Sequence, residues 1–326
     1  MDLSKINELR PDSFKEFIGQ NQIVQELKVY IFSAKETKKT LDHTLFIGPS
    51  GTGKTSLSFV IAKEFDTKIK TINAPMIESP QDLVEIIALM KEGEILFIDE
   101  IHRLDRKIEE ILYSVMDDFM LHIAYKSDEK TKIISVKIPH FTLIGATTLD
   151  GLISTPLLER FTNRFYFEPY TINELKEILR INSKKLDVQF KSEEELEFFV
   201  IRCRSNPRLL NNYLKRFKDF YIYKKQKDIT ISLIEDFFNF INVLEYGLTK
   251  FDVKILGVFY NAFLDTPVSL ESIATIANES VINIKQNIEP FLVSIGFIKR
   301  TTRGRIITSL GKEFYEKKIL KNYYQS

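Results

Sequence analysis

The stretch FIGPSGTGKT, from Phe46 to Thr55, constrains the fold of this chain more than any other. It contains the pattern G-x-x-x-x-G-K-[ST], whose fixed positions are Gly48, Gly53, Lys54 and Thr55. Glycines let backbone N–H groups approach phosphate oxygens, and a helix that starts behind them directs its positive end at the anion. Lys54 supplies a charge for the outer phosphates, and the Thr55 hydroxyl can ligate Mg²⁺. This phosphate cradle requires a buried strand before it and a helix after it.

The flanking sequence supplies that context. The run HTLFIG (43–48) is a short apolar strand that ends in glycine, and one helix face follows at Leu57, Val60, Ile61 and Phe65. Further buried strands are predicted at EILFIDE (94–100) and FTLIGATT (141–148), and an amphipathic helix at 20–36. Buried strands that alternate with amphipathic helices predict an α/β fold, a parallel sheet with helices on both faces.

The pattern changes after about Pro169. Three helix-start signals follow, each a Ser or Thr three residues before a Glu: Thr171 with Glu174, Ser192 with Glu195, and Ser232 with Glu235. They predict a small helical domain. From about residue 248, two short helices precede FIKRTTRGRIIT (297–308), a predicted hairpin around a basic turn, which together outline a winged-helix domain. We therefore predict three domains, at 1–168, 169–243 and 244–326.

Composition narrows the function classes. The chain has 326 residues, 44% hydrophobic and 28% charged, a globular profile. Its formal net charge is +1, so any nucleic-acid surface must be a local patch. The single cysteine, Cys203, fits a reducing compartment, and we expect a buried, inert thiol. Neither a signal peptide nor a membrane span is expected, which predicts a cytoplasmic protein.

A second motif adds chemistry to the cradle. EILFIDE places Asp99 at the tip of an apolar strand, where it can hold Mg²⁺ through water. Glu100 follows, in a position to polarise an attacking water. The acidic pair indicates hydrolysis rather than binding alone; the alternative is a solvated strand end that carries two acids.

The C-terminal region is locally basic. Eight basic residues lie between Lys299 and Lys321, opposed only by Glu313 and Glu316. A basic turn on a narrow hairpin suits the DNA backbone, because it brings charge to phosphates without reading base edges. A solvated charged face is the alternative.

Several motifs together resemble a known family. GPSGTGKT, LFIDEIHRL, FTLIGATT and LLERF, in that order, resemble the AAA+ ATPases. With LRPDSFKEFIGQ (9–20), SNPRLLNNYLKRFKDF (205–220) and IGFIKRTTRGR (295–305), the chain resembles the RuvB family, the motors of bacterial Holliday-junction branch migration. The resemblance covers residues 9 to about 310. It implies an ATP hydrolase that uses ATP and Mg²⁺ and translocates duplex DNA through a hexameric ring in recombination and DNA repair.

The resemblance also implies roles for individual residues. Thr148 would sense the γ-phosphate, with Thr147 as the alternative, and Arg160 would be an arginine finger that completes a neighbouring subunit's site rather than a surface or capping arginine. Arg300 and Arg305 would contact DNA, with Arg303 in the same turn. The nucleotide would be lined by Leu9, Arg10, Gly51, Gly53, Lys54, Thr55, Ser56, Asp118, Phe119, Met120, Tyr170 and Arg208.

Residues 121–138 are predicted to form a strand, a polar turn and a second strand. In the family this hairpin docks on the junction-binding partner RuvA, and a junction resolvase is a further partner to consider. The apolar hairpin residues are otherwise explained by sheet packing: Ile133, Ile134, Val136 and Ile138. Two places depart from the family pattern: Leu158 stands where a basic residue is usual, and Ser205-Asn206 where Gly-Thr is usual.

Two other functions remain as alternatives. Another AAA+ DNA remodeller, such as a clamp-loader subunit, would end in a helical collar, which the predicted winged helix argues against. A nucleotide-gated winged-helix regulator would bind nucleotide without turnover, which Glu100 and Arg160 argue against.

Overall fold

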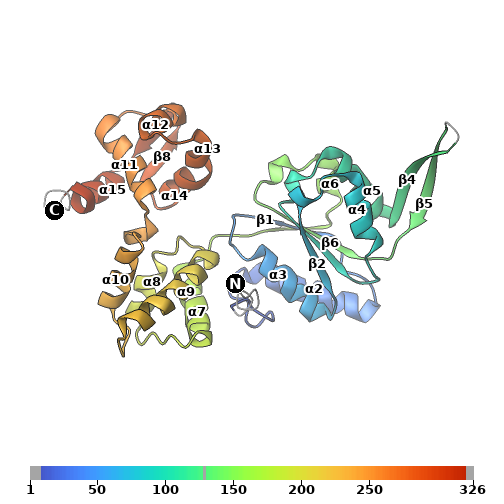
Figure 1. Ribbon diagram of the computed structural model, residues 1–326, viewed down its shortest axis with the longest axis horizontal. Coiled ribbons are helices and arrows are strands. Elements are labelled where there is room, and N and C mark those ends of the chain that lie inside the picture. The colour runs from blue at the N-terminus through green and yellow to red at the C-terminus, as the bar shows by residue number, and fades with distance from the viewer. Residues whose placement is uncertain (1–8, 128–129, 321–326) are drawn as a thin grey trace. The chain divides into compact units, whose positions relative to one another are not determined.

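The computed structural model of the chain describes residues 9–127 and 130–320 (Figure 1). Contacts divide the chain into two compact units. One comprises Met1–Lys185 with Asn206–Asn211, and the other Leu186–Ser205 with Asn212–Ser326.

The first unit is built on a five-stranded sheet in which all neighbouring strands are parallel. The strands, in their order across the sheet, are β2 (Ile69–Asn73), β3 (Ile95–Asp99), β6 (Thr142–Thr147), β1 (Thr44–Ile47) and β7 (Asn163–Tyr166). The predicted strands at 43–48, 94–100 and 141–148 are confirmed as β1, β3 and β6. Because the strands are parallel, the segments that follow these three strands meet at one edge of the sheet.

Helices cover both faces of this sheet (Figure 1). On one face lie α2 (Asn21–Thr37) and α3 (Lys54–Phe65); on the other lie α4 (Pro80–Ala88), α5 (Arg106–Asp118) and α6 (Thr155–Glu159). The predicted helix at 20–36 is confirmed as α2, whose buried residues include Ile23, Leu27, Ile31 and Ala34. Leu27 and Leu57 share one core with Phe46, whereas Leu83 and Leu112 share the other. Short 3₁₀ turns lie at η1 (Ala74–Met76), η2 (Ile101–Arg103) and η3 (Asp150–Leu152).

A two-stranded hairpin projects beyond the main sheet (Figure 1). It consists of β4 (Met120–Ser127) and β5 (Lys130–Lys137), paired antiparallel; residues 128–129 of its turn lie outside the described residues. Ile138 is buried in the core of the first unit, as ordinary packing would have it. Ile133, Ile134 and Val136 are exposed at 69%, 49% and 42%, so sheet packing does not explain them.

Four longer helices follow the sheet: α7 (Ile172–Lys185), α8 (Glu193–Val200), α9 (Pro207–Lys224) and α10 (Ile231–Phe240). Two predicted start signals are confirmed, because Thr171 with Glu174 and Ser192 with Glu195 form reciprocal capping bonds. The third is wrong. Thr230, not Ser232, caps α10, because its extended backbone lets the Thr230 hydroxyl accept from Leu233 N at 3.2 Å.

The helices of the second unit pack around aromatic rings. Phe199 lies 5.1 Å from Phe238 and 5.6 Å from Phe217 between ring centroids, in edge-to-face arrangements. Cys203 is fully buried, as predicted, and burial raises the pKa of its thiol. A protonated, enclosed thiol of this kind is chemically inert.

The second unit ends in a winged helix. Its helices are α11 (Lys250–Ala262), α12 (Leu270–Ala277), α13 (Val281–Asn283), α14 (Glu289–Ser294) and α15 (Ser309–Phe314), with 3₁₀ and π-helical turns at η4 (Glu245–Gly247), η5 (Ile284–Ile288) and η6 (Tyr315–Leu320). The predicted wing is confirmed as β8 (Ile298–Thr301) paired antiparallel with β9 (Gly304–Ile307). Ile255, Phe259, Leu292 and Phe297 belong to its core. Lys321, the last of the predicted basic run, lies outside the described residues.

Candidate nucleotide site

The cradle joins β1 to α3 and depends on glycine. Gly51 has φ +82°, in the left-handed region, and a Cβ there would lie 2.3 Å from Asn206 Oδ1. Gly53 has φ +100°, and a Cβ there would lie 3.1 Å from the Phe17 ring. Side chains at these positions would therefore strain the backbone and collide with the residues that support the loop.

Lys54 lies inside this loop. Its side chain is buried, and Nζ donates to Gly48 O at 2.6 Å and to Pro49 O at 2.9 Å. Burial lowers the pKa of Lys54 and the charge of Arg208 lowers it further, while Asp99 and Glu100 act in the opposite direction. The ammonium is thus a positive charge fixed by the loop's own carbonyls.

Oxygen ligands converge where β3 ends beside α3. Thr55 Oγ1 lies 3.5 Å from Asp99 Oδ2, and Asp99 Oδ1 accepts from Glu100 N at 3.0 Å. A hydroxyl beside a carboxylate is a donor set that Mg²⁺ accepts, because Mg²⁺ prefers oxygen ligands and is usually held by few protein groups. The residues predicted as metal ligands, Thr55 and Asp99, are therefore brought together.

Glu100 has a partner that sequence reasoning missed. Its Oε2 lies 3.5 Å from His102 Nε2, and His102 Nδ1 lies 3.0 Å from Thr147 Oγ1. Burial lowers the pKa of His102, with Glu100 raising and Arg103 lowering it. We assign the ring proton to Nε2, because that nitrogen faces a carboxylate and Nδ1 can accept from the Thr147 hydroxyl. His102 lies in the motif LFIDEIHRL, but a motif does not show which distant residues its side chain contacts.

The two threonines at the end of β6, Thr147 and Thr148, differ in burial and in their hydrogen bonds. Thr147 is fully buried, and its hydroxyl also accepts from Leu149 N at 2.9 Å. Thr148, the predicted sensor, follows directly and is half-buried. The hydroxyl of Thr147 is therefore committed to His102 and the backbone.

Cations from separate segments gather near the cradle. Burial lowers the pKa of Arg10, and the charge of Arg208 lowers it further; Arg208 has the same effect on Lys54. Arg208 therefore lies within electrostatic reach of both Arg10 and Lys54, and such a group of positive charges suits an anion. Leu9, the residue before Arg10, is buried. Tyr170 is also buried and lies against the cradle, since a Cβ added at Gly53 would be 3.2 Å from Tyr170 Oη.

Asn206 is a second residue that sequence reasoning missed, since it stood out only as a departure from a family pattern. Asn206 Oδ1 accepts from Arg208 N at 2.9 Å and from Leu209 N at 3.2 Å, which caps α9. Asn206 Nδ2 donates to Ser50 O at 2.9 Å. It therefore ties the cradle to the start of the helix that carries Arg208.

Arg160 lies elsewhere. Its Nε donates to Asp117 Oδ2 at 2.9 Å, its Nη2 lies 2.8 Å from the same oxygen in an ion pair, and its guanidinium lies 4.4 Å from the centroid of the Tyr113 ring. Together with Asp118, these residues line an open cavity of about 490 Å³. The neighbouring Leu158 packs against the core instead of adding charge.

Strand register places this cavity at the amino ends of the parallel strands, at the opposite edge of the sheet from the cradle, which follows the carboxyl end of β1. In the parallel pair β1–β7, Thr44 aligns with Asn163 and Ile47 with Tyr166. The cradle follows Ile47, whereas Arg160 precedes Asn163, so the two ends of the strands are about 10 Å apart at the rise of an extended strand. The Phe119 ring, just before Met120, lies 5.8 Å from His43, also at the far edge. The structure therefore does not bring Arg160 or residues 118–120 to the cradle of the same chain.

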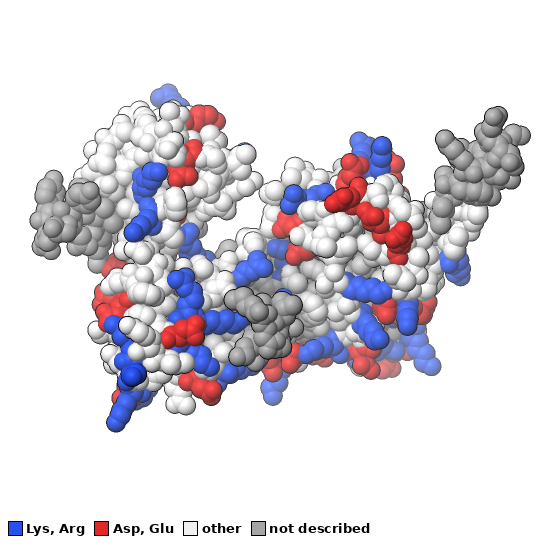
Figure 2. Space-filling model, viewed as in Figure 1, with Lys and Arg blue, Asp and Glu red and all other residues white. Residues whose placement is uncertain are grey.

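The candidate DNA residues lie on the wing. Arg300 and Arg305 are direct cross-strand neighbours, and Arg303 is exposed in the turn between them. Figure 2 shows acidic and basic side chains interspersed on the visible face, in keeping with the small net charge. A DNA surface would therefore depend on local groups such as this arginine pair.

The cradle, the acidic pair at the same sheet edge, and the helical and winged-helix parts define an AAA+ P-loop ATPase. Three family models match the chain: the Holliday junction DNA helicase RuvB P-loop domain at residues 9–166, the RuvB AAA lid domain at 170–243 and the RuvB C-terminal winged helix domain at 245–316. The chain belongs to the RuvB family.

Individual relatives agree along most of the chain. It is 42% identical over 300 residues to the Holliday junction branch migration complex subunit RuvB of Nitratiruptor sp., covering 92% of this chain and 89% of that one. It is 36% identical over 313 residues to the subunit of the same name from Wolbachia pipientis wMel, covering 96% and 95%. The solved structure of the Thermotoga maritima RuvB Holliday junction branch migration motor superposes with a TM-score of 0.83 at 34% identity, covering 96% and 99%.

Within residues 9–127 and 130–320, every helix is too short or too polar to cross a bilayer.

Proposed function

We propose that this protein is a cytoplasmic, ATP-dependent motor that drives branch migration of Holliday junctions in recombination and DNA repair. One observation carries the proposal: Lys54, Asp99 and Glu100 lie at one end of the parallel strands, whereas Arg160 of the same chain lies at the other end. Each subunit would thus carry the ATP-binding half of one site at one edge and the arginine half of another site at the other edge. A neighbouring subunit must complete each site, as a ring of six subunits would provide.

The chain's own residues can be assigned roles at the hydrolytic edge. The cradle's N–H groups and Lys54 bind the ATP phosphates, while Thr55, with Asp99 through water, would hold Mg²⁺, which supplies charge neutralisation when bound. Glu100 accepts a proton from the attacking water, and His102 orients that carboxylate. Thr148 is the sensor, because the Thr147 hydroxyl is already committed.

The groups around the nucleotide come from four segments of the chain. Leu9 and Arg10 lie at the base and sugar, Gly51, Gly53 and Ser56 along the phosphates, and Tyr170 and Arg208 approach from the lid side. We propose domain boundaries at 1–168, 169–243 and 244–326, which the three family matches support.

The opposite edge serves the neighbouring subunit. Arg160 would be delivered to the next subunit's γ-phosphate as a planar cation, and Asp118, Phe119 and Met120 would border the same nucleotide from this side. Their shared position at the far sheet edge supports this assignment.

The proposed motor would move duplex DNA. Arg300, Arg303 and Arg305 on the wing would contact phosphates without reading sequence, as translocation along any duplex requires. The winged helix also argues against a clamp-loader-like remodeller, since a clamp loader would end in a helical collar.

The β4–β5 hairpin would dock a RuvA-like junction-binding protein. Ile133, Ile134 and Val136 are exposed apolar groups on an isolated hairpin, the kind of surface that a partner covers. Ile133→Glu should abolish partner stimulation of ATP hydrolysis and leave basal hydrolysis intact. Leu89→Glu, at an apolar residue with 71% exposure in the turn after α4, is the matched control. A junction resolvase is a further proposed partner.

The deciding experiment is dissolution of a synthetic four-way junction. We expect dissolution that requires ATP and is stimulated by the junction-binding partner. ATP hydrolysis without junction dissolution, with the partner present, would contradict branch migration and favour another AAA+ remodelling activity.

A further inference from the structure

Two of the proposed DNA-binding arginines share a buried carboxylate. Glu289, in the first turn of α14, is 1% exposed. Its Oε1 accepts from Arg300 Nε at 2.7 Å and from Arg305 Nε at 2.8 Å, and Oε2 lies 3.5 Å from Arg305 Nη2. One acid thus bridges two cations that come from opposite strands of the wing.

The carboxylate of Glu289 offsets the repulsion between two like charges on the wing. Arg300 and Arg305 face each other across β8 and β9, and like charges directly opposite each other destabilise a hairpin. Burial alone would raise the pKa of Glu289, but the hydrogen bonds and charges of Arg305 and Arg300 outweigh it and lower the pKa. The carboxylate is therefore ionised at neutral pH and offsets the repulsion between the two guanidinium groups.

The bonds also fix orientation. Both arginines use their Nε edge on Glu289, and Arg300 keeps 57% of its side chain exposed. The backbone of Arg305 is held as well, because its N and O both bond to Val268, each at 2.8 Å. The wing thus carries two cations that are held in place by one acid, Glu289 of α14, which lies between them.

We propose that Glu289 is a positioning residue for DNA binding, one that holds Arg300 and Arg305 side by side as a single phosphate-binding pair. This inference rests on the proposed function, in which these arginines contact DNA. It predicts an effect opposite in sign to that of net charge. Removing an acid from a DNA-binding domain should tighten binding by electrostatics alone, whereas loss of a positioning residue should weaken it.

The test is binding of the full-length chain to a fluorescently labelled duplex DNA of arbitrary sequence, measured by anisotropy over a range of salt concentrations. We expect Glu289→Gln to weaken binding roughly tenfold and to flatten the salt dependence, since fewer phosphates are contacted. Glu271→Gln removes the same charge from an exposed residue of α12 and should bind as well as the unchanged protein or better.

A second variant separates positioning from folding and from charge. Glu289→Asp keeps the charge but is one methylene shorter, so it cannot reach both arginines equally. We expect it also to weaken binding, while thermal unfolding and basal ATP hydrolysis of a folded variant stay near those of the unchanged protein. Tight binding by Glu289→Asp and Glu289→Gln with an unchanged salt dependence would overturn the inference.

The arginines themselves distinguish this inference from the proposed function. Arg300→Ala/Arg305→Ala should lose DNA affinity, and adding Glu289→Gln to that double variant should have little further effect. If the double variant bound DNA normally, the DNA assignment of the wing would fail. If the double variant lost affinity but Glu289→Gln did not, only the positioning role would fail.

Discussion

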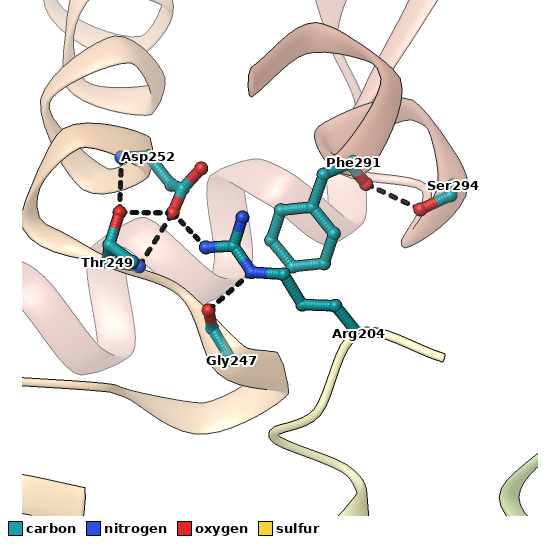
Figure 3. A network of polar contacts seen from close by, with 6 residues as sticks. All are labelled: Arg204, Gly247, Thr249, Asp252, Phe291 and Ser294. Atoms are coloured by element: carbon teal, nitrogen blue, oxygen red, sulfur yellow. Dashed lines mark hydrogen bonds and ion pairs between the residues drawn. The ribbon is translucent and has the colours of Figure 1, made fainter. Parts of the chain in front are cut away.

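Arg204 and Asp252 form an ion pair that joins the loop after α8 to the first turn of α11 (Figure 3). Asp252 is 1% exposed and also accepts from Thr249 N at 2.7 Å. Arg204 Nε donates to Gly247 O at 2.8 Å, and its guanidinium lies 3.9 Å from the centroid of the Phe291 ring. Within the second unit, one arginine therefore connects the helical part to the winged helix.

The backbone at this arginine is unusual. Arg204 and Ser205 both have φ of 51°, in the left-handed region that residues other than glycine seldom adopt. Each costs on the order of 1 kcal/mol, so surrounding contacts must offset the strain. The chain then continues to Asn206, whose side chain bonds to the cradle at Ser50.

We predict that Arg204→Ala strongly destabilises the protein. It would leave Asp252 buried without its cation, which costs on the order of 3 kcal/mol. Urea unfolding should show the midpoint moving to a clearly lower concentration. Lys254→Ala is the control, because the exposed Lys254 lies 3.5 Å from half-buried Glu279 in a pair near the surface, where an ion pair contributes about 1 kcal/mol or less. Equal effects of the two substitutions would argue against a special role for the Arg204 pair.

The hydrolytic edge could be predicted from sequence because its information is local. The cradle residues are contiguous around Lys54, and Asp99 ends an apolar run that can only be a buried strand. Parallel strands bring such ends to one sheet edge without any knowledge of the strand order. The same reasoning located the wing, whose two arms flank a short turn.

Other features depend on register and long-range contacts, which local patterns do not contain. The position of Arg160 at the far edge follows from the alignment of β7 with β1. The contacts of Glu289 with the wing and of His102 with Thr147 join segments that no short motif links. At α10, the pattern offered two start residues two positions apart, and backbone geometry selected Thr230.

Glu100→Gln should bind ATP with nearly unchanged affinity but hydrolyse it about 10²- to 10⁴-fold more slowly, because the amide cannot accept a proton from water. Nucleotide binding by fluorescence and phosphate release in single-turnover experiments measure the two quantities separately. Glu85→Gln, on the exposed face of α4, should leave both unchanged. Normal phosphate release by Glu100→Gln would refute the assigned role.

Mixing two inactive variants tests the shared site. Arg160→Ala subunits keep Lys54, and Lys54→Ala subunits keep Arg160, so an equal mixture should restore about one quarter of the interfaces in a head-to-tail ring. The ATP hydrolysis rate of the mixture should therefore reach a clearly measurable fraction of the rate of the protein without substitutions. Arg160→Ala mixed with the Lys54→Ala/Arg160→Ala double variant should stay inactive. Absence of rescue in mixed rings verified by mass spectrometry would rule out a finger that acts between subunits.

His43 should make stability depend on pH. Leu143 N donates to His43 Nδ1 at 2.9 Å, and burial lowers the pKa of His43 to about 4, against smaller opposing effects that include Asp42 and Asp117. Because the folded pKa lies below the ordinary value of 6.5, its contribution is complete above pH 6.5 and is lost as the pH falls towards 4.

The expected loss from this one group is about 3 kcal/mol across that window, at 1.36 kcal/mol for each unit of pKa difference. Urea unfolding at a series of pH values measures it. His43→Asn should be less stable at pH 7.5 yet show a shallower decline towards pH 4.5, because Asn keeps an acceptor for Leu143 N but cannot titrate. His122→Asn, at an exposed histidine of the hairpin, should retain the full decline. An equally steep decline in His43→Asn would show that other groups cause the acid sensitivity.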